Sequence, residues 1–163
     1  MSQQYSPEEL ATWQRRIAAR ANNKAWELSE KLDRTQAENH EMLHAAHAAM
    51  HLWSIVGNEN NKAHAELLLA HVYALLGDPV RAAKYLQDPN PFFASAQCEA
   101  WEVAMYRTIA ANVAACIGDK SGHRALYKEA ESLIAALDDA KDREILLATL
   151  RVVPIPPSES LGE

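Results

Sequence analysis

Residues 69–86 read LAHVYALLGDPVRAAKYL, which is two helix-forming segments separated by a Gly-Asp-Pro turn. Gly77 allows the chain to turn tightly at the end of the first segment, because it has no side chain. The small side chains of Ala82 and Ala83 allow the two segments to pack closely against each other. This stretch therefore predicts a helical hairpin.

A second stretch resembles the first when the two are aligned on glycine. Residues 110–119 read AANVAACIGD, and the sequence Ala-Leu-Tyr follows at 125–127 after a slip of two residues. A weaker match to the same pattern runs from Trp53 to Gly57, with Ala63 six residues further along. A helix-turn-helix unit that recurs in this way is typical of a stack of hairpins.

The hairpin of residues 69–86 resembles the tetratricopeptide repeat, which has a large and a small residue, then an aromatic residue, a glycine and an alanine at fixed spacing. The residues that fit are Leu69, Ala70, Tyr73, Gly77, Ala82 and Leu86. The second unit departs from the pattern, because Ala114 replaces the aromatic residue and its turn is longer by two residues. The resemblance covers about residues 50–137 and extends to short bacterial proteins of this type. It implies a stack of helical hairpins that functions by binding a protein partner rather than by catalysis. The alternative is a compact helical bundle with another helix order.

Apolar periodicity and helix-capping residues predict about seven helices and no strand. Ser6 before Pro7 is a good helix start, and Thr35 with Glu38 matches a capping box. The predicted ranges are about 7–32, 36–56, 62–76, 80–86, 93–117, 121–137 and 140–150. We expect one all-α domain over residues 1–151 and an extended or disordered Pro-rich tail over residues 152–163.

Composition and charge exclude several classes of protein. The 163 residues are 48% hydrophobic and 23% charged, which is ordinary for a globular domain. The formal net charge of −6 provides no basic footprint for nucleic acid. The sequence has no long apolar stretch for a membrane span and no leader-like N-terminus, and its two cysteines are isolated. We therefore expect a cytoplasmic protein with no nucleic-acid or membrane partner.

The partner-binding surface is predicted on the first helices of the hairpins. Trp26 lies away from the apolar face of its helix, where it can either contact a partner or pack under a neighbouring helix. Asn22 and Asn23 can either bind an extended backbone or be solvated. The predicted contacts are Asn22, Asn23, Trp26, His44, His47 and His71. A homodimer is also expected to be possible, since the open ends of a short stack expose apolar edges.

A histidine stripe provides the competing interpretation. Four histidines lie on one face of the second predicted helix at spacings of four, three and four, and two lie seven apart on the third. They are His40, His44, His47, His51, His64 and His71. These rings are a partly exposed surface stripe, neutral core residues or ligands of a metal.

The metal alternative is a metal-binding helical bundle, or a metal-dependent enzyme, that holds a divalent ion such as zinc. Its predicted ligands are His44, His47, His71, Glu41 and Glu66. Otherwise no cofactor is expected, because the sequence has no nucleophile elbow and no phosphate-binding glycine loop. The remaining aromatic residues, including Trp53 and Trp101, are expected to pack in the core.

Overall fold

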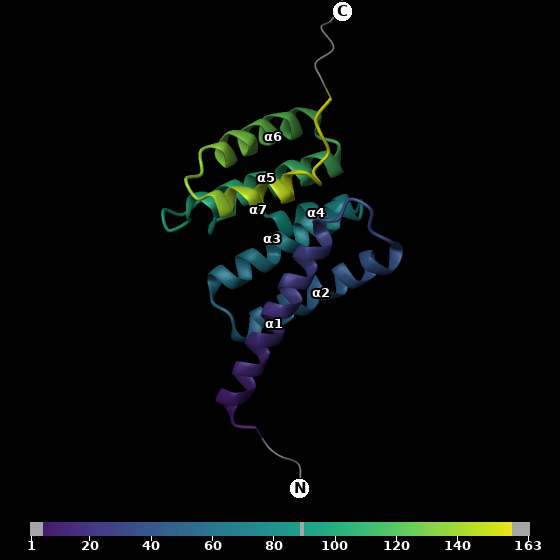
Figure 1. The fold of residues 1–163 in the computed structure, drawn as a ribbon. Helices are drawn as coiled ribbons and strands as arrows, with labels where there is room; N and C mark the ends of the chain where they lie inside the picture. The colour runs from purple at the N-terminus through teal and green to yellow at the C-terminus, as the bar shows by residue number, and fades with distance from the viewer. Residues whose placement is uncertain (1–4, 89, 158–163) are drawn as a thin grey trace, which may run out of the picture.

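Seven α-helices and no strand make up the part of the chain that the computed structural model describes, residues 5–88 and 90–157 (Figure 1). The helices are α1 (Pro7–Ser29), α2 (Gln36–Val56), α3 (Glu59–Leu75), α4 (Pro79–Leu86), α5 (Ala100–Ile117), α6 (Lys120–Ala135) and α7 (Ala140–Leu150). None of them is long and apolar enough to cross a lipid bilayer. The all-α prediction is confirmed.

The helices pack mainly as consecutive antiparallel pairs, α1 with α2, α3 with α4 and α5 with α6. Helix α3 also contacts α1 and α5, and α5 contacts α7. The first helices of the pairs therefore form one continuous layer with α7, in the order α1, α3, α5, α7. Figure 1 shows α5, α6 and α7 stacked on the four helices that precede them.

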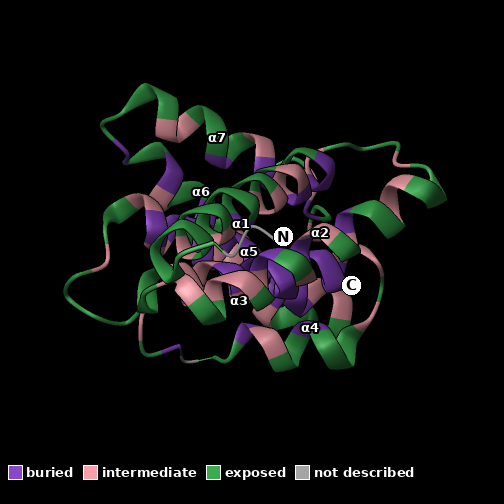
Figure 2. Cartoon of the chain, turned by 90° about the horizontal axis from the view of Figure 1, so that it is seen from below, coloured by how far each residue is buried: buried purple, intermediate pink, exposed green. Residues whose placement is uncertain are grey.

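The core centres on α3 and α5, which are covered from several sides. Residues 67–74 of α3 are all buried, and Ile109 and Val113 of α5 are 0% and 2% exposed. Ala70 and Ala111 are also almost inaccessible, and their small side chains permit close approach of the helix backbones. Figure 2 shows the buried residues gathered in the middle of the molecule, with the outer faces of the helices mostly exposed.

Capping interactions place two helix starts differently from the prediction. Asn58 and Asn61 exchange side-chain and backbone hydrogen bonds, so α3 begins at Glu59 rather than near residue 62. The carboxylate of Glu102 accepts a hydrogen bond from the backbone amide of Glu99, and α5 begins at Ala100 rather than near residue 93. The predicted Ser6 cap at the start of α1 and the predicted capping box at the start of α2 are confirmed.

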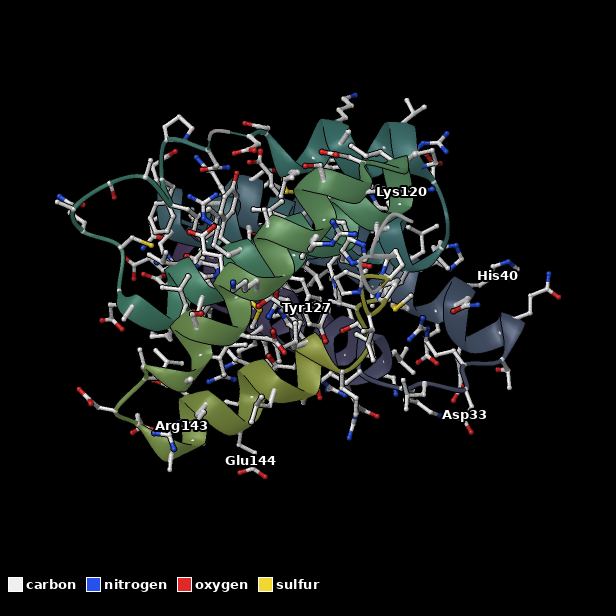
Figure 3. The ribbon with its side chains drawn as sticks, turned by 90° about the horizontal axis from the view of Figure 1, so that it is seen from above. Asp33, His40, Lys120, Tyr127, Arg143 and Glu144 are labelled. Atoms are coloured by element: carbon white, nitrogen blue, oxygen red, sulfur yellow. The ribbon has the colours of Figure 1, made fainter. Side chains whose placement is uncertain are left out.

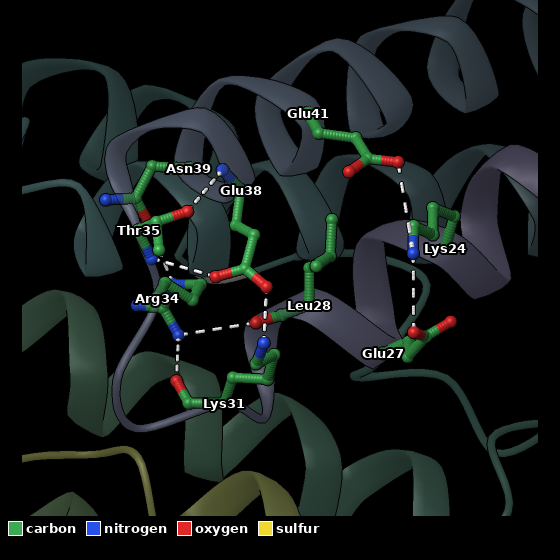
Figure 4. A network of polar contacts seen from close by, with 9 residues as sticks. All are labelled: Lys24, Glu27, Leu28, Lys31, Arg34, Thr35, Glu38, Asn39 and Glu41. Carbon is green, nitrogen blue, oxygen red and sulfur yellow. Dashed lines mark hydrogen bonds and ion pairs between the residues drawn. The ribbon is translucent and has the colours of Figure 1, made fainter.

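The connection between α1 and α2 is held by polar contacts with the carbonyl groups that α1 leaves free (Figure 4). Helix α1 ends at Ser29, before the predicted end near residue 32. The Arg34 guanidinium donates to the carbonyl oxygens of Leu28 and Ser29 at 3.4 and 3.0 Å. Its Nε donates to Oδ1 of Asn39 at 2.9 Å. Arg34 therefore adds donors to the carbonyls at the C-terminal end of α1, where few helical amides remain to pair with them.

The apolar stripe of α1 is buried only in its second half. Ala25 and Leu28 lie in the core, whereas Leu10, Trp13 and Ile17 are 50–52% exposed. The first turns of α1 extend past the other helices at the lower end of Figure 1. Apolar periodicity alone did not show that this part of the stripe lies beyond the neighbouring helices.

The first part of the predicted tail lies against α6. Val153 is 3% exposed, and Nε2 of His123 is 2.7 Å from the carbonyl oxygen of Pro154. Arg124 donates to the carbonyl oxygen of Pro157 at 3.3 Å. The rest of the predicted tail, residues 158–163, lies outside the described residues.

Three glycines end helices, but for two different reasons. Gly77 and Gly118 have φ of +74° and +80°, the left-handed conformation that glycine adopts readily. Gly57 has φ of −89°, so its cap is not left-handed. A Cβ at Gly57 would lie 2.6 Å from the carbonyl oxygen of Trp53, which excludes a side chain for lack of space.

We expect Gly118→Ala to lower the free energy of unfolding by about 1 kcal/mol, because L-residues are strained at positive φ. No atom lies within 4 Å of the added Cβ, so the cost comes from the backbone alone. Gly118→Asn is the control, and its free energy of unfolding should fall less, since Asn tolerates this conformation better than Ala. Urea denaturation of the three proteins measures the difference, and equal stability of the Ala variant would contradict the left-handed turn.

Candidate functional site

A cavity of about 340 Å³ is lined by residues of α1, α3, α5 and α7, the layer on which the partner-binding surface was predicted, together with Trp53 of α2. Its lining combines three of the four tryptophans of the chain with three asparagines, two apolar side chains, a histidine and a glutamate. These residues are Asn22, Trp26, Glu30, Trp53, Asn60, Asn61, His64, Trp101, Met105 and Ile145. The volume is in the range of small-molecule and side-chain pockets.

Trp26 of α1 is held in the cavity wall by a buried histidine of α3. Its ring stacks on that of His71, with the centroids 5.8 Å apart and the planes 28° from parallel. His71 is 0% exposed, and the amide of Asn112 donates to its Nδ1 at 3.0 Å. Burial lowers the pKa of His71 to about 3, with a further contribution from Arg34, so the ring is neutral at pH 7.

Trp101 of α5, which also lines the cavity, is held in a similar way. Its ring stacks on His64, with the centroids 5.4 Å apart and the planes 25° from parallel. Its Nε1–H donates to the Glu99 carboxylate at 2.7 Å. The ring of His64 also has edge contacts with Phe92 and Phe93. An imidazole and a hydrogen bond thus fix the orientation of this indole.

A buried carboxylate organises the floor of this region. His64 Nε2 lies 2.7 Å from Oε1 of Glu102, and the amide of Asn60 donates to the same oxygen at 3.0 Å. The second oxygen accepts the amide of Glu99 at 2.8 Å. Burial raises the pKa of Glu102, but these hydrogen bonds together outweigh it and the net pKa is lowered. The carboxylate is therefore ionised at neutral pH.

Glu30 adds a second acidic group at the α1 side of the cavity. Its pKa is raised because burial disfavours the carboxylate more than the charge of Arg151 favours it. Within residues 5–88 and 90–157 the Glu30 carboxylate forms no ion pair, and no Lys or Arg lines the cavity. The site is therefore aromatic and acidic.

The structure brings only part of the predicted contact set together. Asn22 and Trp26 line the cavity, whereas Asn23 is exposed and lies in a separate shallow depression beside Lys24. His44 is exposed on α2, away from the cavity lining. His71 has no exposed surface, so it supports Trp26 and does not contact a partner directly.

The histidine stripe of α2 faces largely outward. His40, His44 and His51 are exposed, and Figure 3 shows His40 at the edge of the molecule. His47 is half-buried, and its Nε2 lies 2.7 Å from the hydroxyl of Tyr73. Burial lowers the pKa of His47, and the charges of His44 and Arg81 lower it further.

The structure does not gather the predicted metal ligands. His47 is paired with Tyr73 and His71 with Asn112, while Glu41 lies 3.9 Å from Lys24. Glu66 is half-buried on α3, and burial raises its pKa. In residues 5–88 and 90–157, no three His, Cys, Asp or Glu side chains are placed so that they could hold a metal ion. The geometry therefore does not support the zinc alternative.

Several residues of the site were missed by the sequence analysis. Trp53 and Trp101 were expected to be core residues, but both are half-buried and line the cavity. Asn60 and Glu102 are 42 positions apart and meet only because α3 packs on α5. The sequence offered one local indication of this site: His64 follows Asn60 by one helical turn, so the two side chains can contact the same group.

The site has no activated thiol. Burial raises the pKa of Cys98 to about 11, and the neighbouring charge of Glu102 adds to this effect. The thiol is protonated at neutral pH and is therefore a poor nucleophile. The His64–Glu102 pair is a polar contact between α3 and α5.

Comparison of the chain with protein-family models, with curated proteins and with solved structures finds no match. What is shown is an all-helical protein whose seven helices, within the described residues, pack as adjacent pairs. Its function is therefore inferred from the geometry of the cavity.

His71 makes the stability of the fold dependent on pH. Its pKa is lower in the folded than in the unfolded chain, so the unfolded chain takes up the proton first. The stabilisation is complete above pH 6.5 and is lost as the pH falls toward 3. Between pH 6.5 and 4.5 we expect a loss of about 2 kcal/mol in the free energy of unfolding from this residue.

His71→Gln keeps an acceptor for Asn112 and removes the titrating ring. We expect urea denaturation to show a shallower decrease in its stability than in that of the wild type over this pH range. Equal slopes for the two proteins would show that His71 is not buried in the neutral form.

Proposed function

We propose that this protein is an interaction module that binds an extended segment of a partner protein in the cavity of α1, α3, α5 and α7. The observation that carries the proposal is the combination of three tryptophans and three asparagines in one cavity on that layer. The tetratricopeptide resemblance implies binding on the same layer and supports the proposal.

The tryptophans would supply most of the binding energy. Tryptophan is enriched among the residues that dominate protein interfaces, because a rigid ring buries a large area at a small entropic cost. Trp26 and Trp101 are already held by stacking on His71 and His64. Little side-chain ordering therefore remains to oppose binding.

The asparagines would bind the backbone of the segment. An asparagine amide both donates and accepts, which matches the N–H and C=O groups of an extended chain. The Asn22 side chain forms no hydrogen bond with the described residues. It is therefore available to a ligand at the edge of the cavity.

Peptides selected on the immobilised protein from a random display library provide the test. We expect Asn22→Ala to weaken binding of a selected peptide about fivefold, as for the loss of one hydrogen bond. Asn23→Ala is the matched control, because it changes the adjacent asparagine outside the cavity. Equal affinity of both variants and the wild type, measured by calorimetry, would contradict binding in this cavity.

Self-association is a second proposal, favoured by the exposed stripe of α1. Leu10, Trp13 and Ile17 are spaced by three and four residues, as in a coiled-coil seam. In an antiparallel pair of α1 helices, Leu10 of each copy lies opposite Ile17 of the other. The same arrangement brings the acidic start of one helix, Glu8 and Glu9, toward the arginines of the other, which include Arg16 and Arg20.

We expect Ile17→Glu to shift the protein from dimer to monomer, because two like charges would meet in the seam. Ile117→Glu is the control: Ile117 is equally exposed, at 49%, but lies at the end of α5 outside the stripe. Light scattering on the eluting protein measures the mass. A monomeric wild type, or a dimer unaffected by Ile17→Glu, would contradict the proposal.

A further inference from the structure

We infer that the cavity accepts a basic side chain of the bound segment, and that this side chain is arginine. This inference rests on the proposed function, since it specifies the chemistry of the segment that the cavity holds. It follows from the aromatic walls, the unpaired carboxylate of Glu30 and the absence of lining cations in the described residues.

The aromatic walls favour a cation. The face of an indole carries partial negative charge, and tryptophan is the best of the aromatic side chains at attracting a cation. Trp26, Trp53 and Trp101 come from three different helices and line one cavity. A planar guanidinium can stack on such a ring and still donate hydrogen bonds at its edges.

Glu30 is the acidic lining residue, and among the described residues no cation forms a direct ion pair with it. It is half-buried, lines the cavity and forms no ion pair with the described residues. Arg151 donates to the carbonyl oxygen of Glu30 at 3.5 Å, and its charge lowers the pKa of the Glu30 carboxyl, but the two side chains form no ion pair. A guanidinium in the cavity would supply the missing cation and offset the cost of burying this carboxylate.

Glu102 contributes a second negative charge next to the cavity, because it contacts the lining residues His64 and Asn60. Its carboxylate is 5% exposed and is satisfied by His64, Asn60 and a backbone amide. It therefore acts on a bound guanidinium through its charge, and the direct contact with the guanidinium is left to Glu30. The two carboxylates disfavour an acidic side chain in the cavity, and a purely apolar side chain would leave Glu30 unpaired.

The experiment compares two blocked pentapeptides, Ser-Gly-Arg-Gly-Ser and the same peptide with citrulline in place of arginine. Citrulline has nearly the same shape as arginine but carries no charge. Binding is followed by NMR through the four indole N–H signals, at low ionic strength to limit screening. Trp13 is an internal control, since it lies on the first turns of α1 and outside the cavity lining.

We expect the arginine peptide to shift the indole signals of Trp26, Trp53 and Trp101 and to leave that of Trp13 unchanged. Its affinity should exceed that of the citrulline peptide about tenfold, as for a cation on partly desolvated rings. Glu30→Gln should reduce this preference about fivefold. Glu27→Gln removes the same charge from an exposed position of α1 and should leave the preference unchanged.

The outcomes separate the two proposals. Equal affinity for arginine and citrulline, or an unchanged preference in Glu30→Gln, would overturn the inference while library-selected peptides could still bind the cavity. If neither these peptides nor the selected ones shift the three indole signals, the proposed function and the inference both fail.

Discussion

The burial of α3 is the constraint on which the rest of the structure depends. Residues 67–74 have no exposed face, so helices must cover α3 from several sides. Helices α1, α2, α4 and α5 do so, and α5 is in turn covered by α6 and α7. This requirement aligns α1, α3, α5 and α7 in one layer, and the cavity with its three tryptophans lies on that layer.

Two polar contacts between α3 and α5 connect this core to the cavity. His71 with Asn112 and His64 with Glu102 bury groups that would be costly without partners. The same two histidines stack on Trp26 and Trp101. The hydrogen bonds of these two histidines in the core are therefore coupled to the orientation of the indoles that line the cavity. A change in either histidine should affect both.

The sequence predicted the helical architecture well because its signals are local. A capping residue, a helix-ending glycine and an apolar periodicity act within a few residues, as at Thr35, Gly77 and Gly118. It also indicated the layer of the site and two of its members, Asn22 and Trp26. It did not reveal Trp101 or Glu102, because in a helical core a half-buried aromatic residue has the same spacing as a buried one.

The sequence by itself thus determined the number and order of the helices, the glycine turns at residues 77 and 118, and the acidic character of the chain. The tertiary structure decided which side chains meet. Pairing of Asn60 with Glu102, or of Trp26 with His71, depends on helix packing between residues some 40 positions apart. Such contacts leave no periodic or local trace in the sequence, because they are set by the angles and distances between helices.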